Sequence, residues 1–168
     1  QNLIDGTVPY VVVDEKQKPS FFFIGKPDSL LAISRSGFFS ENNSEIYRLT
    51  AVAAEEGTFD LVYQSASAAG TLLKGTEQEI DFTHQITLIE NVDKIEFNYF
   101  GYNHLYDKTA IDSNLAPTWA NEYSGIDKIL VPEKIKLSII KNDKVLSMYS
   151  LLDLNAESKL AAYAPENQ

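Results

Sequence analysis

Hydrophobic and polar residues alternate most clearly in two stretches of the second half of the chain. In residues 92–102, Ile95 and Phe97 fall on one face of an extended strand, and in residues 131–140 apolar positions again alternate with lysines. A period of two is typical of a β-strand with one buried face. Residues 103–128 between them are polar and too numerous for a hairpin turn. We therefore predict two scaffold strands joined by a long loop.

Turn residues between apolar runs predict two hairpins. Residues 46–54 and 59–63 flank a turn that contains Gly57, a residue able to adopt positive φ. The turn at residues 141–144, Lys-Asn-Asp-Lys, places Asn and Asp at the positions where hairpin turns need positive φ. Its partner strand is expected to end near Leu152.

Shorter strands are predicted around these hairpins. Three consecutive valines favour a strand within residues 8–13, despite Pro9. Phenylalanines in residues 21–24 indicate a buried strand, with residues 30–33 as its hairpin partner. Residues 72–89 fit either two short strands or a strand followed by a helical turn, and His84 falls in this region.

Together these patterns predict a mainly β fold with antiparallel sheets, in a single domain over residues 1–168. Strands recur every eight to twelve residues with turn residues between them, and no stretch shows a convincing helical period. Residues 155–168 are expected to be a frayed C-terminal tail, with a short helix at residues 156–163.

Composition and charge narrow the functional classes. The chain has 168 residues, 44% of them hydrophobic, and a net charge of -10. Nucleic acids and anionic membranes attract clustered Lys and Arg, which this sequence does not show, so neither is expected as a partner. Cysteine is absent, which excludes disulfides, thiol nucleophiles and thiolate metal sites. Met148 is the only methionine, so we expect Gln1 not to be the translation start.

Motifs for catalysis are nearly absent, and we expect no enzymatic activity and no cofactor. His84 and His104 are the only histidines, and each is interpreted as a surface or loop residue. Oxygen ligands gather in the loop 103–127, where a calcium site is chemically feasible, but without EF-hand spacing a solvated acidic loop is the preferred interpretation. Carboxylates for a glycosidase pair are present, although their spacing selects none: Asp60, Glu96, Asp107 and Glu122.

Aromatic residues concentrate around the long loop. Tyr102, Tyr106, Trp119 and Tyr123 are the candidate partner-contact residues, because aromatic side chains in a long loop offer contact area to a ligand or protein. The alternative, that they pack the loop back onto a sheet, remains open.

The order of these residues resembles a known family. The resemblance is to the J-type minor pseudopilins of type II secretion, and to related minor pilins of type IV pili, in the pattern of a strand, a variable loop containing Trp, and a second strand introduced by Pro. The positions that carry it are Val92, Ile95, Phe97, Tyr99, Trp119, Leu130, Val131, Pro132, Ile135, Leu137 and Ile139. Residues 23–25, 30–34 and 46–63 follow the same order of elements, so the resemblance spans nearly the whole chain.

The resemblance implies a non-catalytic structural subunit. The chain would be the periplasmic head of a protein anchored in the inner membrane by an N-terminal helix that this sequence does not contain, and the whole protein would then be α+β. Its partners would be other minor pseudopilins and secretion-system components at the tip of a pseudopilus, in protein transport across the outer membrane.

Two other interpretations stay open. One is a secreted β-sandwich that binds a carbohydrate or another ligand through the aromatic loop 99–123. The other is an acidic hydrolase that uses loop carboxylates.

Overall fold

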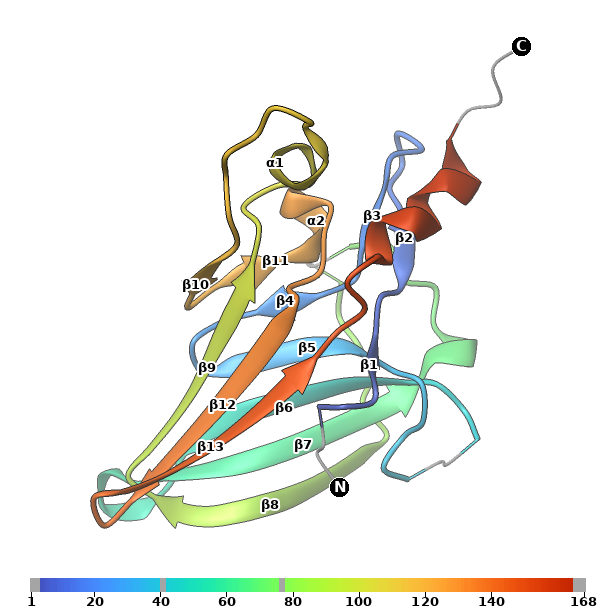
Figure 1. Cartoon of the computed structure of the whole chain (residues 1–168). Coiled ribbons are helices and arrows are strands. Elements are labelled where there is room, and N and C mark those ends of the chain that lie inside the picture. The colour runs from blue at the N-terminus through green and yellow to red at the C-terminus, as the bar shows by residue number, and fades with distance from the viewer. Residues whose placement is uncertain (1–3, 40–41, 76–77, 165–168) are drawn as a thin grey trace.

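The computed structural model describes residues 4–39, 42–75 and 78–164. The chain is mainly β, and every strand pairing in the described part is antiparallel, as the sequence predicts. The strands form a seven-stranded sheet, a four-stranded sheet and a small two-stranded sheet (Figure 1).

The larger sheet is built around the central strands β5 and β6. Its strands in spatial order are β11 (Tyr123–Ser124), β4 (Ile24–Gly25), β5 (Ser29–Ser34), β6 (Glu45–Ala53), β7 (Phe59–Ser67) and β8 (His84–Val92). The short strand β1 (Thr7–Val8) pairs with the end of β5 that β4 leaves open.

The smaller sheet contains both scaffold strands that the alternation predicts. Its order is β10 (Thr118–Ala120), β9 (Lys94–Gly101), β12 (Lys134–Lys141) and β13 (Lys144–Leu151). The two scaffold strands β9 and β12 are direct neighbours, with Ile95 opposite Ile139 and Tyr99 opposite Ile135. The remaining pair is β2 (Val11–Val13) with β3 (Pro19–Phe21).

The segment between β9 and β12 is partly structured. Besides β10 and β11 it contains the short helices α1 (Leu105–Thr109) and α2 (Gly125–Lys128). Two 3-10 turns, η1 (Glu55–Gly57) and η2 (Ala68–Gly70), flank β7, and a longer 3-10 helix, η3 (Ala156–Tyr163), follows β13. None of the helices in the described residues is long and apolar enough to cross a bilayer.

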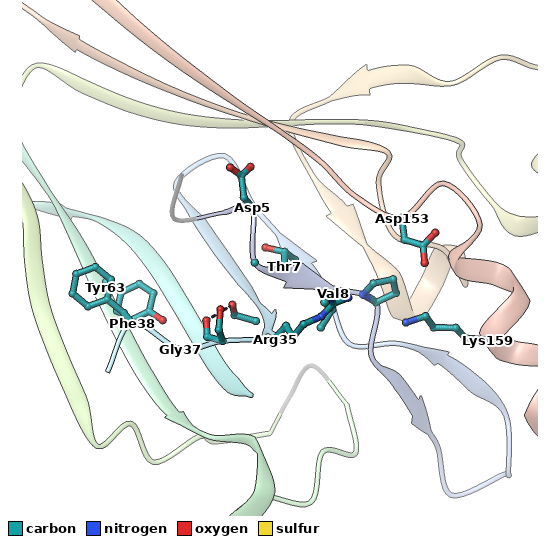
Figure 2. A pocket seen from close by; sticks show the side chains of 13 residues that line it. Asp5, Thr7, Val8, Arg35, Gly37, Phe38, Tyr63, Asp153 and Lys159 are labelled. Atoms are coloured by element: carbon teal, nitrogen blue, oxygen red, sulfur yellow. Dashed lines mark hydrogen bonds between the residues drawn. The ribbon is translucent and has the colours of Figure 1, made fainter. Parts of the chain in front are cut away.

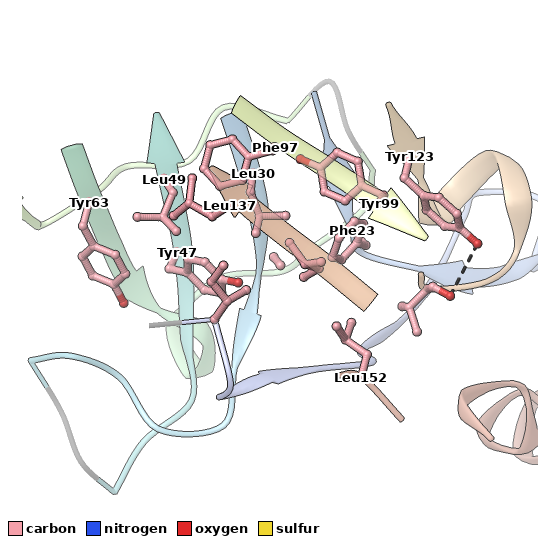
Figure 3. Packing of buried hydrophobic residues seen from close by; sticks show 14 of the residues in the cluster. Phe23, Leu30, Tyr47, Leu49, Tyr63, Phe97, Tyr99, Tyr123, Leu137 and Leu152 are labelled. Atoms are coloured by element: carbon pink, nitrogen blue, oxygen red, sulfur yellow. Dashed lines mark hydrogen bonds between the residues drawn. The ribbon is translucent and has the colours of Figure 1, made fainter. Parts of the chain in front are cut away.

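The main hydrophobic core lies between the two large sheets. Fully buried side chains of the larger sheet, such as Leu30, Tyr47 and Leu49, meet Phe97 and Leu137 of the smaller sheet (Figure 3). The inward residues of β9 and β12 are the alternating positions that the sequence predicts to be buried. Alternation therefore identifies the faces of these strands correctly.

A second cluster covers the opposite face of the larger sheet. Ile33 and Ile46 point to this side and pack with Val12, Phe22 and Leu73 from segments outside that sheet. Because β5 packs on both faces, its residues 30–33 form a continuous apolar run at the centre of the fold.

One corner connects both large sheets. Strand β8 passes into β9 through the single residue Asp93, so one extended run of chain belongs first to the larger and then to the smaller sheet. The Asn91 amide donates to Asp60 of β7 at 2.9 Å, and the Asp93 carboxylate accepts from the Asn142 amide at 2.7 Å. These two hydrogen bonds connect the corner to the β6–β7 hairpin and to the turn of the β12–β13 hairpin.

Both predicted hairpins are confirmed. Strands β6 and β7 pair over their full length around η1, where Gly57 has φ 76°. Strands β12 and β13 pair around Asn142 and Asp143, whose φ angles are 50° and 60°. The Asn-Asp turn chemistry identifies this hairpin because few other residues accept two successive positive φ values.

Two predicted strands are wrong in their extent. The run at residues 8–13 is divided into β1 and β2, since Pro9 has no N–H to donate to a continuous ladder. The run at residues 21–24 is not one strand: the Phe23 amide donates to the Phe21 carbonyl at 3.1 Å in a tight turn. That turn ends β3 and starts β4, which pairs with β5 only at Leu30 and Leu31.

The region at residues 72–89 fits neither predicted alternative. It contains an irregular segment up to residue 83 and then β8, which starts at His84 and runs on to Val92. Near the C-terminus the predicted helix at residues 156–163 is confirmed as η3. Ala156 is buried and Lys108 of α1 pairs with Glu157 at 2.8 Å, while residues 165–168 of the predicted tail lie outside the described residues.

Four buried tyrosines predict the alkaline behaviour of the protein. Burial raises the pKa of the phenols of Tyr47, Tyr63, Tyr99 and Tyr123. A pKa that is higher in the folded than in the unfolded state gives stability that is complete below the unfolded value of about 10 and is lost as pH rises above it.

We therefore expect unfolding to start above about pH 10, with the ultraviolet signal of tyrosinate rising together with the loss of the circular dichroism of the β-sheets. Full ionisation of all nine tyrosines in a chain that keeps its folded spectrum would contradict this expectation.

Candidate functional site

The outer face of the smaller sheet presents aromatic and basic side chains to solvent. In β9 and β12 the inward positions fill the core, so Phe100, Lys134 and Lys136 fall on the opposite face. The register places Trp119 beside Phe100, and Lys136 beside Tyr149. We call this surface the aromatic–lysine face, and its members are Phe100, Trp119, Lys134, Lys136, Tyr149 and Leu151.

The rings of this face contact one another without forming a flat stack. The ring centroids of Phe100 and Trp119 are 5.3 Å apart with their planes at 50°, and those of Trp119 and Tyr149 are 6.4 Å apart at 68°. The indole is 47% exposed and Tyr149 is 53% exposed. The result is a tilted aromatic cluster with one broad indole surface.

Lysines lie over the rings. The Lys134 ammonium is 5.0 Å from the Phe100 centroid, and the Lys136 ammonium is 5.8 Å from the Tyr149 centroid. Such cation–π contacts hold the lysine chains along the sheet while their ammonium groups keep access to water. The face therefore combines apolar area with positive charge.

The smaller sheet is the basic part of an acidic protein. Its four strands carry five lysines and one glutamate, whereas the whole chain carries 24 acidic and 14 basic residues. Lys94 neutralises that glutamate: its ammonium contacts Glu96 at 2.7 Å and the hydrogen bond lowers the pKa of the carboxyl. The lysines of β12 and β13 then face solvent with little acidic compensation from their own sheet.

The four predicted contact residues have different surroundings. Trp119 lies on the aromatic–lysine face, and Tyr106 is 73% exposed on α1, away from the sheet. Tyr102 is partly exposed just after β9. Tyr123 is buried, with its hydroxyl donating to the Tyr102 carbonyl at 3.0 Å.

Tyr123 fixes the long segment to the sandwich. Its ring packs edge-on against Phe23, whose ring also meets Tyr99 edge-on. Gly101 lies so close to Tyr123 that a Cβ there would be 2.9 Å from the ring. The tyrosine therefore supports the loop from below and does not form part of its exposed surface.

Three aromatic or aliphatic residues of the face are not among the contact residues predicted from the sequence. Phe100, Tyr149 and Leu151 lie on strands, where aromatic and aliphatic residues are expected to be buried. The available signal is alternation: Tyr149 and Leu151 fall on the opposite parity from Met148 and the buried Ser150. Extending the period of two through this hairpin places them outside.

The histidines have local structural contacts. His104 caps α1, since its Nδ1 accepts the Tyr106 amide at 3.1 Å. The ring of His84 stacks on Phe39 with centroids 4.7 Å apart and planes at 15°, and its Nδ1 lies 3.0 Å from the Thr83 hydroxyl.

Among the described residues, no three His, Asp or Glu side chains come together as a metal site. In the loop 103–127, where a calcium site is chemically feasible and a solvated acidic loop is the preferred interpretation, the Asn103 amide oxygen accepts from Lys128 at 2.6 Å. Of the glycosidase candidates, Asp60 accepts the Asn91 amide and Glu96 is held by Lys94 on the outer face. These two carboxylates thus contribute to the corner and to the sheet surface.

A polar cavity of about 770 Å³ lies where the N-terminal segment, the segment after β5, strand β7 and the C-terminal segment meet (Figure 2). Asp5 comes from the N-terminal segment, Arg35 follows β5, and Asp153 and Lys159 come from the C-terminal segment. Phe38 and Tyr63 lie together at one end of the cavity, with their centroids 5.7 Å apart. Charges of both signs line it, so it selects for neither an anion nor a cation.

Comparison with known proteins identifies no relative. No protein-family model matches the sequence, and neither curated proteins nor solved structures give a significant match. The aromatic–lysine face is therefore the basis on which a function can be proposed.

Replacing Trp119 with alanine is expected to cost about 1 kcal/mol of stability, because a half-exposed ring with two aromatic neighbours contributes roughly that much. The fold should remain intact, since Trp119 is outside the core. Urea unfolding measures the change, and Tyr106→Ala on α1 is the matched exposed control. A loss as large as that of a core residue would contradict the placement of Trp119 on the surface.

Proposed function

We propose that this chain is a non-catalytic assembly domain that binds other protein subunits through the aromatic–lysine face. The observation that carries the proposal is the concentration of exposed Trp119, Tyr149 and Leu151 on one sheet face. Tryptophan and tyrosine dominate the energetic centres of protein interfaces, and exposed apolar patches of this kind mark interaction surfaces.

Within this proposal, the chain is the head of a minor pseudopilin of type II secretion or of a minor pilin. Support comes from the positions behind the resemblance: Phe97, Tyr99, Ile135 and Leu137 are buried on the neighbouring strands β9 and β12. The variable segment between those strands brings Trp119 to the outer face. The head would lie in the periplasm, and its partners would be other minor pseudopilins and secretion-system components.

The natural gene product tests this proposal. We expect an apolar helix of roughly 20 residues before Gln1, which would anchor the head in the inner membrane. A photo-reactive amino acid at position 119 should then crosslink, in cells, to proteins that carry the same type of N-terminal helix. The same group at Lys74, outside the smaller sheet, is the control. A natural product without such a helix would refute the pseudopilin assignment.

A second candidate function is ligand binding by a secreted β-sandwich, and the exposed indole of Trp119 favours it. Sugar rings pack on flat aromatic faces, and this surface offers one indole beside two tilted rings. Binding on a glycan array that is lost in Trp119→Ala and kept in Tyr106→Ala would favour this function. Unchanged crosslinking to subunits together with a blank array would favour assembly.

A further inference from the structure

Strand β13 forms a long and regular edge of the smaller sheet, with Lys144 as its only charged residue. Within the described residues it pairs with β12 on one side only, and every residue from Lys144 to Leu151 keeps regular register with that neighbour. Residues 145–151 contain neither a charged side chain nor proline. Val145 is 62% exposed and Leu146 is 56% exposed. We call residues 144–148 the β13 edge.

The hairpin turn determines which amides point outward. A two-residue turn makes Lys141 and Lys144 a hydrogen-bonded pair, so the pairs alternate from there. Ser147 is opposite Ser138 in a non-hydrogen-bonded pair, and their hydroxyls approach to 3.4 Å, as the closer spacing of such a pair allows. The backbone N–H and C=O groups of Val145 and Ser147 are therefore directed away from β12.

The other sheet edges are protected in ways that the β13 edge is not. Strand β8, the edge of the larger sheet, carries polar and charged residues such as Gln85 and Glu90, and its pairing with β7 is interrupted by register shifts. Strand β10, at the far side of the smaller sheet, has three residues. Charge, bulges and shortness are the features by which proteins block edge pairing. The β13 edge has neither bulges nor shortness, and its only charged residue is Lys144 at its first position.

Charge specifies the partner. Lys144 begins the β13 edge, and Lys141 lies opposite it on β12, on the same face of the sheet. A strand added to this edge would carry the side chains of that face alongside the Lys144 ammonium group, with Lys141 one strand further in. Acidic side chains would be attracted there, and lysines would be repelled.

We propose that the β13 edge binds an extended acidic segment of a partner protein as an additional strand. The proposal rests on the proposed assembly function and specifies the site and the chemistry of the partner. Main-chain hydrogen bonds to Val145 and Ser147 supply affinity, and the lysines supply specificity.

Synthetic peptides test the proposal on the chain alone. A soluble peptide of alternating valine and aspartate should bind, and its lysine counterpart should not. On binding, the amides of Val145 and Ser147 should become protected from hydrogen exchange, and those of Gln85 and Thr87 on β8 should not. The double variant Lys141→Glu/Lys144→Glu should weaken binding on the order of tenfold or more. The control variant is Lys74→Glu/Lys159→Glu, which makes the same charge change outside the smaller sheet.

Main-chain pairing between the peptide and β13 is tested by one change in the chain and one change in the peptide. Ser147→Pro removes an outward N–H without removing a bond to β12 and should abolish binding. An aspartate peptide with N-methylated valines keeps its charge but cannot form a ladder, so its failure to bind tests pairing even if the proline variant does not fold. Binding without protection of Val145 and Ser147, equal binding of the lysine peptide, or self-association that Ser147→Pro abolishes would each overturn the proposal.

These outcomes are separate from those for the assembly function. A natural gene product without an N-terminal helix would refute the pseudopilin assignment and leave peptide binding unaffected. Crosslinking from position 119 without peptide binding would support assembly and overturn strand addition at the β13 edge.

Discussion

Replacing Tyr99 with alanine is expected to lower the free energy of unfolding by about 3–5 kcal/mol, the range for removing a fully buried aromatic ring. Tyr99 has no exposed surface, and its ring packs against Phe23 between the two sheets. Its hydroxyl also donates to the carbonyls of Lys26 and Ser29 at 2.9 and 3.0 Å. The substitution would thus leave a cavity and remove the phenol donor from both carbonyls, of which that of Ser29 keeps the Lys26 amide at 2.8 Å.

Tyr99→Phe separates these two contributions. It keeps the ring and removes the hydroxyl, so about 1 kcal/mol of the loss should remain. Denaturant unfolding monitored by circular dichroism gives both values, with Tyr106→Ala as an exposed control expected to change stability by no more than about 0.5 kcal/mol. Equal losses in Tyr99→Phe and Tyr99→Ala would show that the ring contributes no packing energy.

Replacing Gly25 with alanine is the second substitution with a large expected effect, about 3 kcal/mol of destabilisation. A Cβ at this position would lie 2.3 Å from Cζ of Tyr99 and within 2.7 Å of two further ring atoms. The ring cannot retreat easily, because it is buried and its hydroxyl is fixed by two carbonyls. Strand β4 would have to move away from the core instead.

A double-mutant cycle tests this explanation. In a Tyr99→Ala background the methyl group of Gly25→Ala has space, so its cost should largely disappear. Gly70→Ala is the matched control, since nothing lies within 4 Å of a Cβ at that position. Additive effects of the two substitutions at positions 25 and 99 would contradict a direct clash.

The sequence predicts those parts of the fold that depend on local rules. Alternation gives the buried faces of β9 and β12, because a strand places successive side chains on opposite sides. The Asn142–Asp143 turn gives a hairpin because both residues tolerate positive φ. These signals lie within a few residues of each other and need no knowledge of the rest of the chain.

The remaining parts depend on contacts between distant segments. The phenylalanines at residues 21–24 look like one strand, and only the separate positions of β2 and β5 divide them between two sheets. In the sequence, nothing distinguishes Tyr123 from Trp119, because both are aromatic residues of the same long loop. Tyr123 becomes buried because Phe23 and Gly101 form a site for its ring, whereas Trp119 meets Phe100 and the distant Tyr149 on an open sheet face.

The corner at Asp93 has a consequence for how the chain folds. The β6–β7 and β12–β13 hairpins each join residues that are close in sequence, so each can form early. Joining them requires β9 to pair with β12 across the long segment that separates them, and that closure carries the larger entropic cost. We therefore expect both hairpins to form before this closure, and the closure to limit the rate of refolding. Asp93, where the two hairpins meet, would then acquire its native contacts late.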